Sequence, residues 1–454
     1  MFVKKIFLCG LFFLFAAASA EAGAVDPLPA FTPEDRVLIF APHPDDEAIG
    51  TGGVIQMARR AGAQVRVVLV TNGENNEFSF LVYKKRLIFR PKEILAMGEL
   101  RRRESLSAMF SLGVGEEDIL SLGYPDFGTM EIMTRYWGDM KPFRSMLSRV
   151  RKVPYETALS FGAPYLGESV LNDFRKVILD FRPTKVFVSH PADTNRDHRA
   201  VYLFLRVSLW DLDGKIEQPD VYPYLVHVVG WPKPRGYFPG RPSYIPKDFF
   251  KSDMKWSMLN LPPDTIQAKY DAIKRYVSQI KYAPKYLLTF ARNSELFADY
   301  PVVSLVRQMV SEVVWQAVGS GDDGRPLQKG TSAEHISSLA YARQGNNFLV
   351  KISLRRTFER DMGISVFLLG YKTSVPFGEM PKLNLLTDIG GFHIKDRKKT
   401  VPVHDVQFIV NDKDIVFIVP LSLMGDPDLV LSCAKTSLYD LTIDETAWRV
   451  LSIQ

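Results

Sequence analysis

The sequence predicts two domains: an α/β domain with a Rossmann-like, mostly parallel sheet and helices on both faces, followed by an antiparallel β-sandwich. Short apolar runs alternate with helical segments in the longer, N-terminal part of the chain, whereas apolar residues recur with period two toward its C-terminus. A turn-rich segment, residues 318–332, lies between the two patterns. We therefore expect the α/β domain to span residues 31–317 and the sandwich residues 333–454.

The α/β prediction begins with a strand–helix–strand unit. Residues 36–41 form an apolar run that ends at a proline and predicts a buried strand. Residues 47–61 have helical spacing and stop at Gly62, and residues 65–70, rich in β-branched side chains, predict a second strand. A βαβ unit of this kind indicates parallel strands.

Further segments continue the alternation. The patterns predict a strand at residues 185–189 and helices at 101–112, 170–180 and 198–212, and helical periodicity returns over 265–317. Two long stretches, residues 125–165 and 215–265, are rich in Pro, Gly and aromatic residues. Long irregular insertions in a compact domain are usually loops around a site, which is what we expect of both.

The C-terminal pattern is that of short strands. Apolar residues alternate with polar ones over residues 348–354, and the apolar runs 408–410 and 415–418 flank a turn at residues 411–412. Strands of this length with regular turns predict an antiparallel β-sandwich.

The N-terminus resembles a secretory signal peptide. Two lysines precede an uncharged apolar run, residues 6–18, and the small residues 18–20 supply a cleavage site, with Ala22 and Ala24 as alternative ends. The run is shorter than the roughly 20 residues of a membrane span, and no other run is long enough. We expect residues 1–20 to be removed from a secreted or periplasmic protein without a transmembrane segment.

Composition excludes several classes of protein. Aromatic residues make up 12% of the chain, and its 30 Gly and 29 Pro are dispersed, which excludes a disordered or collagen-like chain. The 57 Lys+Arg against 51 Asp+Glu give an excess too small for a dedicated nucleic-acid binder, so no nucleic-acid partner is expected. Cleavage would leave Cys433 as the only cysteine and thus no internal disulfide.

The first candidate site is residues 41–47 (APHPDDE), directly after the first predicted strand. In open α/β sheets, functional sites form at the carboxyl ends of the strands. One imidazole, of His43, and two carboxylates, of Asp45 and Asp46, lie here together. An acidic helix N-terminus would also explain the carboxylates, because they favour the positive end of the helix dipole.

The second candidate site is residues 189–199 (SHPADTNRDHR), after the strand 185–189 and hence at the same edge. Two loops rich in His and Asp at one sheet edge can converge on one metal ion. Catalytic zinc sites use three ligands of these types and leave a position open for water. The remaining histidines are isolated, and we expect structural roles for them: His227, His335, His393 and His404.

At these two motifs the chain resembles the PIG-L/LmbE-like family of zinc-dependent N-deacetylases, over roughly residues 35–210. Blocks similar to those of the family lie between the motifs and in the same order: VTNGE at 70–74, RRRE at 101–104, LGV at 112–114 and LGYPD at 122–126.

The resemblance implies that His43, Asp46 and His198 bind Zn2+ and that Asp45 is the general base. Consecutive residues in a turn can point apart, so Asp46 can bind the metal while Asp45 reaches the water that attacks the substrate. An aspartate in that place can accept a proton and pass it to the leaving amine.

The resemblance also implies substrate contacts. Glu74 and Arg101 occupy positions near the family's pocket, although a solvated surface charge explains each equally well. Asp193, in the second loop, is a further candidate contact.

One position departs from the family. Many relatives carry a histidine that assists the oxyanion where this chain has Asn195. Asn donates a hydrogen bond but carries no proton at neutral pH. The sequence leaves open whether Asn195 or His190 assists; we favour Asn195, because it lies three residues before His198.

The C-terminal sandwich weakly resembles carbohydrate-binding modules at residues 418–423 (IVPLSL) and 448–451 (WRVL), and a packing domain explains it as well. The predicted function is an exported zinc-dependent hydrolase that removes an N-acetyl group from an N-acetylated sugar in a glycan, glycoconjugate or glycolipid. The alternatives are an amidase on another N-acyl compound and a non-catalytic saccharide-binding protein with the same fold.

Overall fold

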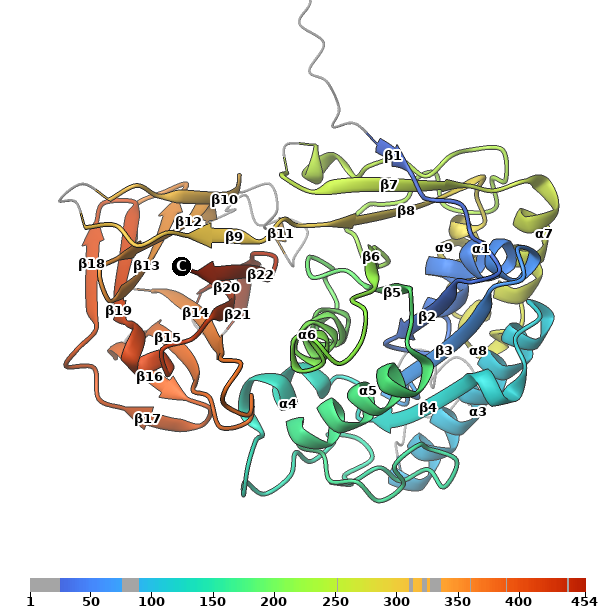
Figure 1. Cartoon of the computed structure of the whole chain (residues 1–454), viewed down its shortest axis with the longest axis horizontal. Helices are drawn as coiled ribbons and strands as arrows, with labels where there is room; N and C mark the ends of the chain where they lie inside the picture. Colours follow the sequence, from blue (N-terminus) through green and yellow to red (C-terminus); the bar gives the residue numbers. More distant parts are fainter. Residues whose placement is uncertain are drawn as a thin grey trace, which may run out of the picture.

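The computed structural model describes residues 25–75, 90–250, 252–309, 313–320, 325–326, 336–359, 361–388, 390–438 and 441–454. The predicted signal peptide, most of the predicted linker and His335 lie outside these residues. Figure 1 shows two parts side by side, an α/β part (residues 25–299) and a β-rich part (residues 303–454). None of the described helices is both long and apolar enough to cross a membrane.

The α/β part is built on one eight-stranded sheet in the order β1-β7-β8-β6-β5-β2-β3-β4. Strands β6, β5, β2, β3 and β4 are parallel, and β8 runs antiparallel to its neighbours β6 and β7. The sheet is thus mostly parallel, as predicted. Its strands are β1 (Val25–Pro27), β2 (Arg36–Ala41), β3 (Gln64–Thr71), β4 (Ile119–Tyr124), β5 (Lys185–Ser189), β6 (Asp220–Tyr224), β7 (Lys255–Asn260) and β8 (Ser294–Asp299).

Helices cover both faces of this sheet. Val37 and Ile39 of β2 belong to one apolar core and their neighbours Leu38 and Phe40 to another, because successive side chains of a strand point to opposite faces. The first core includes side chains of α1, α3 and α7, and the second includes side chains of α4, α5 and α6. The helices are α1 (Asp46–Arg60), α3 (Pro91–Ser111), α4 (Thr129–Arg135), α5 (Gly167–Phe181), α6 (Arg196–Asp211), α7 (Pro263–Ile273), α8 (Val277–Ile280) and α9 (Pro284–Leu287).

Glycines let helix α1 lie close to its neighbours. A Cβ atom at Gly50 would lie 2.6 Å from the ring of Tyr224, and one at Gly53 would lie 2.5 Å from Leu261. Larger residues would push the helix away. Gly50 and Gly53 therefore allow helix α1, which begins within the first motif, to pack closely against Tyr224 and Leu261.

The β-rich part consists of two sheets, of which one has five strands, in the order β10-β12-β13-β19-β18, and the other nine, β11-β21-β20-β14-β15-β16-β17 with β22 and β9 attached. A shared core, with Val350 and Phe417 from one sheet and Val366 and Leu385 from the other, lies between them. This confirms the predicted sandwich. Its strands are β9 (Val303–Leu305), β10 (Gln316–Ser320), β11 (Arg325–Pro326), β12 (Ile336–Gln344), β13 (Asn347–Leu354), β14 (Met362–Tyr371), β15 (Lys382–Asp388), β16 (Gly391–Asp396), β17 (Lys399–Val401), β18 (Gln407–Asn411), β19 (Asp414–Pro420), β20 (Leu429–Leu438), β21 (Leu441–Glu445) and β22 (Arg449–Ile453).

The strand pairing changes earlier than the predicted boundary at residue 317. Strand β9 pairs with β22 and β10 pairs with β12, so residues 303–305 and 316–320 join the β-rich part. The helical periodicity expected over residues 265–317 ends with α9, after which β8 completes the first sheet. Here pairing with distant strands overrides the local pattern.

An apolar interface joins the two parts. Trp137, in the loop after α4, lies 5.2 Å from the ring of Phe377, and Trp210 of α6 lies 5.0 Å from Tyr371. Trp448 belongs to the same core cluster as the second face of the parallel sheet. The β-rich part therefore packs against the side of the sheet that is covered by α4, α5 and α6.

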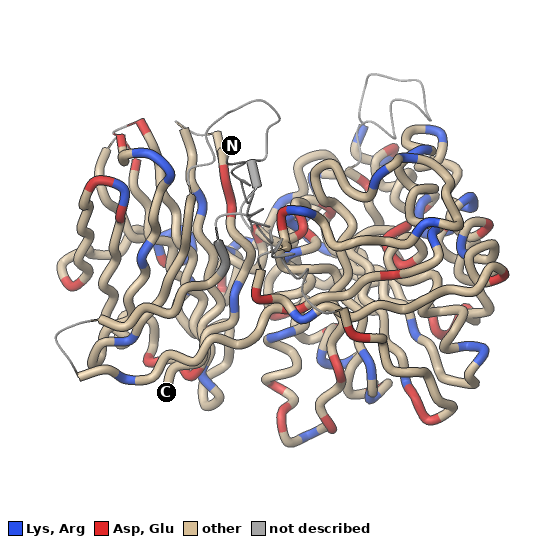
Figure 2. The backbone as a smooth tube through the Cα atoms, turned by 90° about the horizontal axis from the view of Figure 1, so that it is seen from above, with Lys and Arg blue, Asp and Glu red and all other residues tan. Residues whose placement is uncertain are grey.

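Charged residues are spread over the whole molecule. Figure 2 shows basic and acidic residues interspersed over both parts.

Candidate metal centre and active site

The two predicted loops meet at the carboxyl edge of the parallel sheet. One loop follows β2 and the other follows β5, and these strands are hydrogen-bonded neighbours. Their side chains converge: His43 Nδ1 lies 3.2 Å from Asp46 Oδ2 and 3.3 Å from His198 Nε2, and the last two atoms lie 3.0 Å apart. All three residues are buried. The structure thus brings together the three ligands that the resemblance implied.

This triangle of atoms fits a zinc ion. Ligands at about 2.0–2.1 Å from a tetrahedral zinc are separated by about 3.3–3.4 Å, close to the observed spacing. Two imidazoles and one carboxylate are also a donor set that suits zinc, whereas magnesium prefers six oxygens. Among the described residues, these three form one of the groups of His and Asp close enough to hold a metal.

The other nitrogen of His43 faces two further carboxylates. Nε2 lies 3.1 Å from Asp126 Oδ1 and 3.3 Å from Asp197 Oδ2. The backbone N–H groups of Phe127 and Thr129 donate to Asp197, at 2.5 and 3.1 Å. Metal-binding histidines are usually oriented by such carboxylates. The sequence did not reveal this role, although both aspartates lie in motifs that it singled out.

His198 is oriented in the same way by Asp193. Its Nδ1 lies 3.2 Å from Asp193 Oδ2, and the backbone N–H groups of Asn195, Val226 and His227 donate to the same carboxylate, at 2.8, 3.1 and 2.9 Å. Asp193 is fully buried and absent from the cavity wall. The predicted substrate contact is therefore wrong for this residue: its oxygens are engaged in holding the loop and the ligand ring.

His227 is a pocket residue that the sequence analysis missed. Its ring lies 4.6 Å from that of His198, and its Nδ1 lies 3.3 Å from Asp193 Oδ1. It follows β6, a third parallel strand that ends at the same edge, and it lines the cavity. His227 is therefore not isolated, as its sequence neighbours suggested, but lies beside the ring of His198. The sequence signal that could have indicated a place in the site is that His227 follows shortly after the end of a strand. His393 is partly exposed and His404 is exposed, and both lie in the β-rich part.

Asp45 lies at the cavity wall beside Arg101. Its Oδ2 is 3.4 Å from Arg101 Nη2, and the same guanidinium donates to the carbonyl oxygens of Gly73 and Pro44, at 2.6 and 2.8 Å. Arg101 is 3% exposed and is therefore no solvated surface charge. Burial raises the pKa of Asp45 to about 8, against the opposing effect of Arg101. Arg101 thus fixes Asp45 toward the cavity.

The acidic side chains lie at the N-terminus of helix α1, where Glu47 accepts from the N–H of Asp45 at 3.0 Å. Asp45 is the N-cap residue of α1, with φ of 127°, but its side chain makes no capping hydrogen bond. Asp46 Oδ2 instead accepts from the N–H of His43 at 3.0 Å, and buried Glu47 accepts from the Tyr276 hydroxyl at 2.6 Å. Asp46 and Glu47 do lie in the first turn of α1, so an acidic helix N-terminus is present. It does not account for the whole motif, because Asp46 also contacts the rings of His43 and His198.

Asn195 and His190 occupy different places. Asn195 caps helix α6 by accepting from the N–H of Asp197 at 2.8 Å, and it lines the cavity, which leaves its amide N–H groups for a ligand. His190 is fully buried, accepts from the N–H of Ala192 at 3.0 Å and packs 5.5 Å from the ring of Tyr300. His190 does not line the cavity, so the structure does not place it for catalysis.

Glu74 is also set back from the cavity. It is 1% exposed, and one of its oxygens accepts from the N–H of Asp126 at 3.3 Å. Burial raises the pKa of Glu74 to about 8. It is absent from the cavity wall, so the structure gives it no contact with a substrate and places it behind Asp126.

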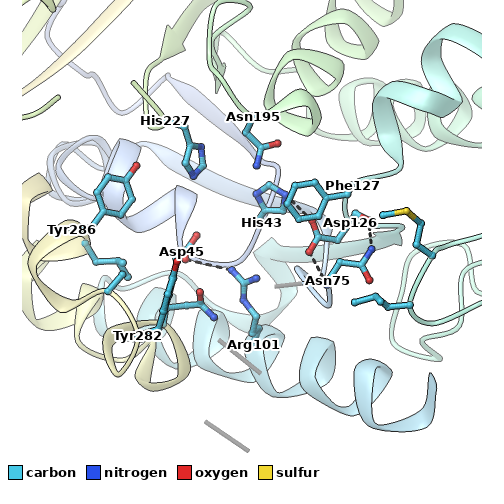
Figure 3. A pocket seen from close by; sticks show the side chains of 15 residues that line it. His43, Asp45, Asn75, Arg101, Asp126, Phe127, Asn195, His227, Tyr282 and Tyr286 are labelled. Atoms are coloured by element: carbon cyan, nitrogen blue, oxygen red, sulfur yellow. Dashed lines mark hydrogen bonds and ion pairs between the residues drawn. The ribbon is translucent and has the colours of Figure 1, made fainter. Parts of the chain in front are cut away.

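A cavity of about 660 Å3 opens above the metal centre (Figure 3). Its floor is polar, and its walls come from the first predicted insertion and from the α8–α9 region. The stretch 125–165 contributes four lining residues and also contains helix α4, whereas the stretch 215–265 contributes His227 and contains strands β6 and β7. The lining residues are His43, Asp45, Asn75, Arg101, Asp126, Phe127, Met146, Leu147, Asn195, His227, Gln279, Tyr282, Ala283, Tyr286 and Leu287.

Comparison with known proteins agrees with the resemblance drawn from the motifs. Residues 38–208 match the family described as PIG-L, GlcNAc-PI de-N-acetylase. The matched residues lie within the α/β part. The match does not extend to the β-rich part, whose similarity to carbohydrate-binding modules stays a prediction.

The similar curated proteins are deacetylases. The 1D-myo-inositol 2-acetamido-2-deoxy-alpha-D-glucopyranoside deacetylase of Mycobacterium sp. (strain JLS) is 26% identical over 261 residues, which cover 55% of this chain and 75% of that protein. The protein of the same name from Mycobacterium avium is 40% identical over 81 residues, 18% of this chain and 26% of that protein. The chain therefore spans about a quarter of the length of this second relative.

Solved structures of deacetylases also align with the chain. N,N'-diacetylchitobiose deacetylase from Pyrococcus horikoshii is 20% identical, covering 54% of this chain and 71% of that one with a TM-score of 0.33. The deacetylase of the antimicrobial A40926 pseudoaglycone is 14% identical, covering 58% of this chain and 96% of that one with a TM-score of 0.36.

Proposed function

We propose that this protein is an exported, zinc-dependent hydrolase that removes the N-acetyl group from an N-acetylated sugar. The observation that carries the proposal is the triangle of His43, Asp46 and His198 beneath a cavity whose wall holds the carboxylate of Asp45. The PIG-L match and relatives that are named as deacetylases of a 2-acetamido sugar support it.

The three converging residues would hold the zinc, which as a Lewis acid activates water and polarises an amide carbonyl. Asp45 accepts a proton from the attacking water and returns it to the nitrogen of the leaving amine. Of the two carboxylates on the cavity wall, Asp45 and Asp126, the second is engaged by His43 Nε2. Arg101 keeps this carboxylate oriented through three acceptors. The carboxylates behind His43 and His198 fix the orientation of both rings.

The acetyl oxygen gains negative charge during the attack and needs hydrogen-bond donors. Asn195 and His227 are labelled on the same side of the cavity in Figure 3. Because the Asn195 oxygen already caps helix α6, its amide N–H groups are the part left to donate to the acetyl oxygen. The structure thus favours Asn195 over His190 for this role.

A sugar suits the walls of the cavity. Phe127, Tyr282 and Tyr286 line it, and aromatic rings form favourable surfaces for the apolar faces of sugars. Polar groups at the floor can bind hydroxyl groups. This combination favours an N-acetylated saccharide over a purely apolar N-acyl compound.

Acetate release from a panel of N-acetylated sugars and non-sugar N-acyl compounds tests this proposal. We expect the zinc-loaded protein to release acetate from at least one N-acetylated sugar and from none of the non-sugar compounds. A protein that holds zinc but releases no acetate would favour the saccharide-binding alternative. Release from the non-sugar compounds alone would favour the amidase.

Export rests on the predicted signal peptide, residues 1–20. We expect protein recovered outside the cytoplasm of its native host to begin near Glu21. N-terminal sequencing that finds Met1 retained in membranes would contradict export without affecting the proposed chemistry.

A further inference from the structure

The connection between β21 and β22, residues 446–448, reaches from the β-rich part to the loop that carries His198. The N–H of Trp448 donates to the carbonyl oxygen of Pro191 at 3.2 Å, and the carbonyl oxygen of Thr446 accepts from Arg199 Nη1 at 3.1 Å. Trp448 is 1% exposed, so this contact lies inside the interface. The second metal loop is therefore held by main-chain groups of the other part of the molecule.

Arg199 links this contact to the loop. It follows His198 directly in helix α6 and is 3% exposed. Its Nε donates to the carbonyl oxygen of Asp193, while its Nη1 lies 3.0 Å from Glu445 Oε1 at the end of β21. The planar guanidinium can bind these groups at the same time because its donors point in fixed directions. Arg199 thus connects Glu445 with Asp193.

Asp193 connects Arg199 with the metal centre. Its carboxylate faces the Nδ1 atoms of both His198, at 3.2 Å, and His227, at 3.3 Å. A buried ion pair such as Arg199–Glu445 contributes little net stability, because desolvation offsets its attraction. What the pair does provide is a fixed position for the carbonyl of Asp193. The contacts therefore run without a break from the sandwich to a predicted zinc ligand.

We infer that Glu445 is a positioning residue of the metal centre, and that the β-sandwich is an integral part of the hydrolase which braces the second metal loop. The inference rests on the proposed zinc site. It assigns the sandwich a role toward the metal that does not depend on sugar binding. Residues that orient metal ligands from behind typically contribute about 10- to 100-fold to metal affinity.

Zinc affinity of the full chain, measured by competition with a chromophoric chelator, tests the inference. Glu445→Gln keeps the shape of the side chain and removes its charge. Arg199→Lys keeps a cation opposite Glu445 but cannot bind Asp193 and Thr446 together. The matched control is Asp253→Asn, which removes an ion pair with Arg449 of 2.5 Å that joins the same two parts.

We expect Glu445→Gln and Arg199→Lys to bind zinc at least about 10-fold more weakly than wild type, and Asp253→Asn to bind it as tightly. Melting temperatures of the metal-free proteins should fall by similar amounts in the three variants, which separates positioning from general destabilisation. Wild-type zinc affinity in Glu445→Gln and Arg199→Lys, or a loss of the same size in Asp253→Asn, would overturn the inference without contradicting the zinc site. If Glu445→Gln does not fold, Arg199→Lys decides alone. A wild-type chain that binds no zinc would refute the site itself and the inference with it.

Discussion

The loop after β2 and the loop after β5 supply the same kinds of ligand but are held in place differently. The first loop is fixed from within the α/β part: Arg101 of α3 binds the carbonyl oxygen of Pro44, and the N–H of Thr71 in β3 donates to that of Pro42 at 3.0 Å. Arg101 and Thr71 both lie within 60 residues of this loop along the chain. The main chain of the first loop is thus held by residues near it in the sequence, whereas the ring of His43 also faces the distant Asp197.

The second loop depends on distant residues. Its Asp193 carboxylate binds the N–H groups of Val226 and His227, and its flanks are held by Thr446 and Trp448 of the β-rich part. The main chains of the two loops therefore differ in how far along the sequence their support extends. Two loops with similar His/Asp motifs can thus be held by near residues in one case and by distant residues in the other.

The largest effect is expected from removing a ligand in either loop. His43→Ala and His198→Ala should each lose the single zinc ion per chain, because a three-ligand site with two ligands left binds poorly. Metal analysis of the purified variants checks this, with His393→Ala, a partly exposed histidine of β16, as the control that keeps its zinc. If both ligand variants kept a full complement of zinc, the two loops would not form the metal centre.

A second prediction separates the two carboxylates of the first loop. Asp45→Asn should keep zinc and lose about 100- to 10,000-fold in turnover, because it removes a proton acceptor without removing a ligand. Asp46→Asn should lose zinc. Metal content and acetate release measured on both variants decide it. Equal loss of metal in the two would mean that their roles are wrongly divided.

The smallest expected effect lies in the second loop and distinguishes its two candidate donors. Asn195→Ala should lower turnover by roughly 100-fold, the typical cost of removing one donor to an oxyanion. His190→Ala should leave turnover within a few fold of wild type, because His190 lies away from the cavity. Steady-state rates at saturating substrate compare the two. Near-wild-type turnover in Asn195→Ala would reject the assignment of the donor.

Local sequence predicted much of this molecule. Strand ends at Ala41 and Ser189 placed both motifs at one sheet edge, and the period-two pattern of residues 348–354 placed the sandwich strand β13. These features depend on neighbours along the chain. A buried parallel strand is apolar along its whole length, and in a sandwich strand with one exposed face apolar and polar residues alternate. Each pattern can therefore be recognised from a few consecutive residues.

The rest depended on contacts between distant residues. No local pattern distinguishes Asp193, buried behind a ligand, from a carboxylate facing a substrate, because both follow a strand in a polar loop. His227 lacks neighbouring ligands in the sequence and reaches the site only because β6 lies beside β5. The boundary near residue 300 was missed for the same reason: β9 is defined by its pairing with β22 at the other end of the domain.

The most direct test of the central claim is an anomalous difference map from crystals of the zinc-loaded protein, recorded at the zinc absorption edge. The account predicts one peak within about 2.0–2.2 Å of His43 Nδ1, Asp46 Oδ2 and His198 Nε2. A zinc peak between Asp193 and His227 instead, or no peak at the convergence of the two loops, would contradict it.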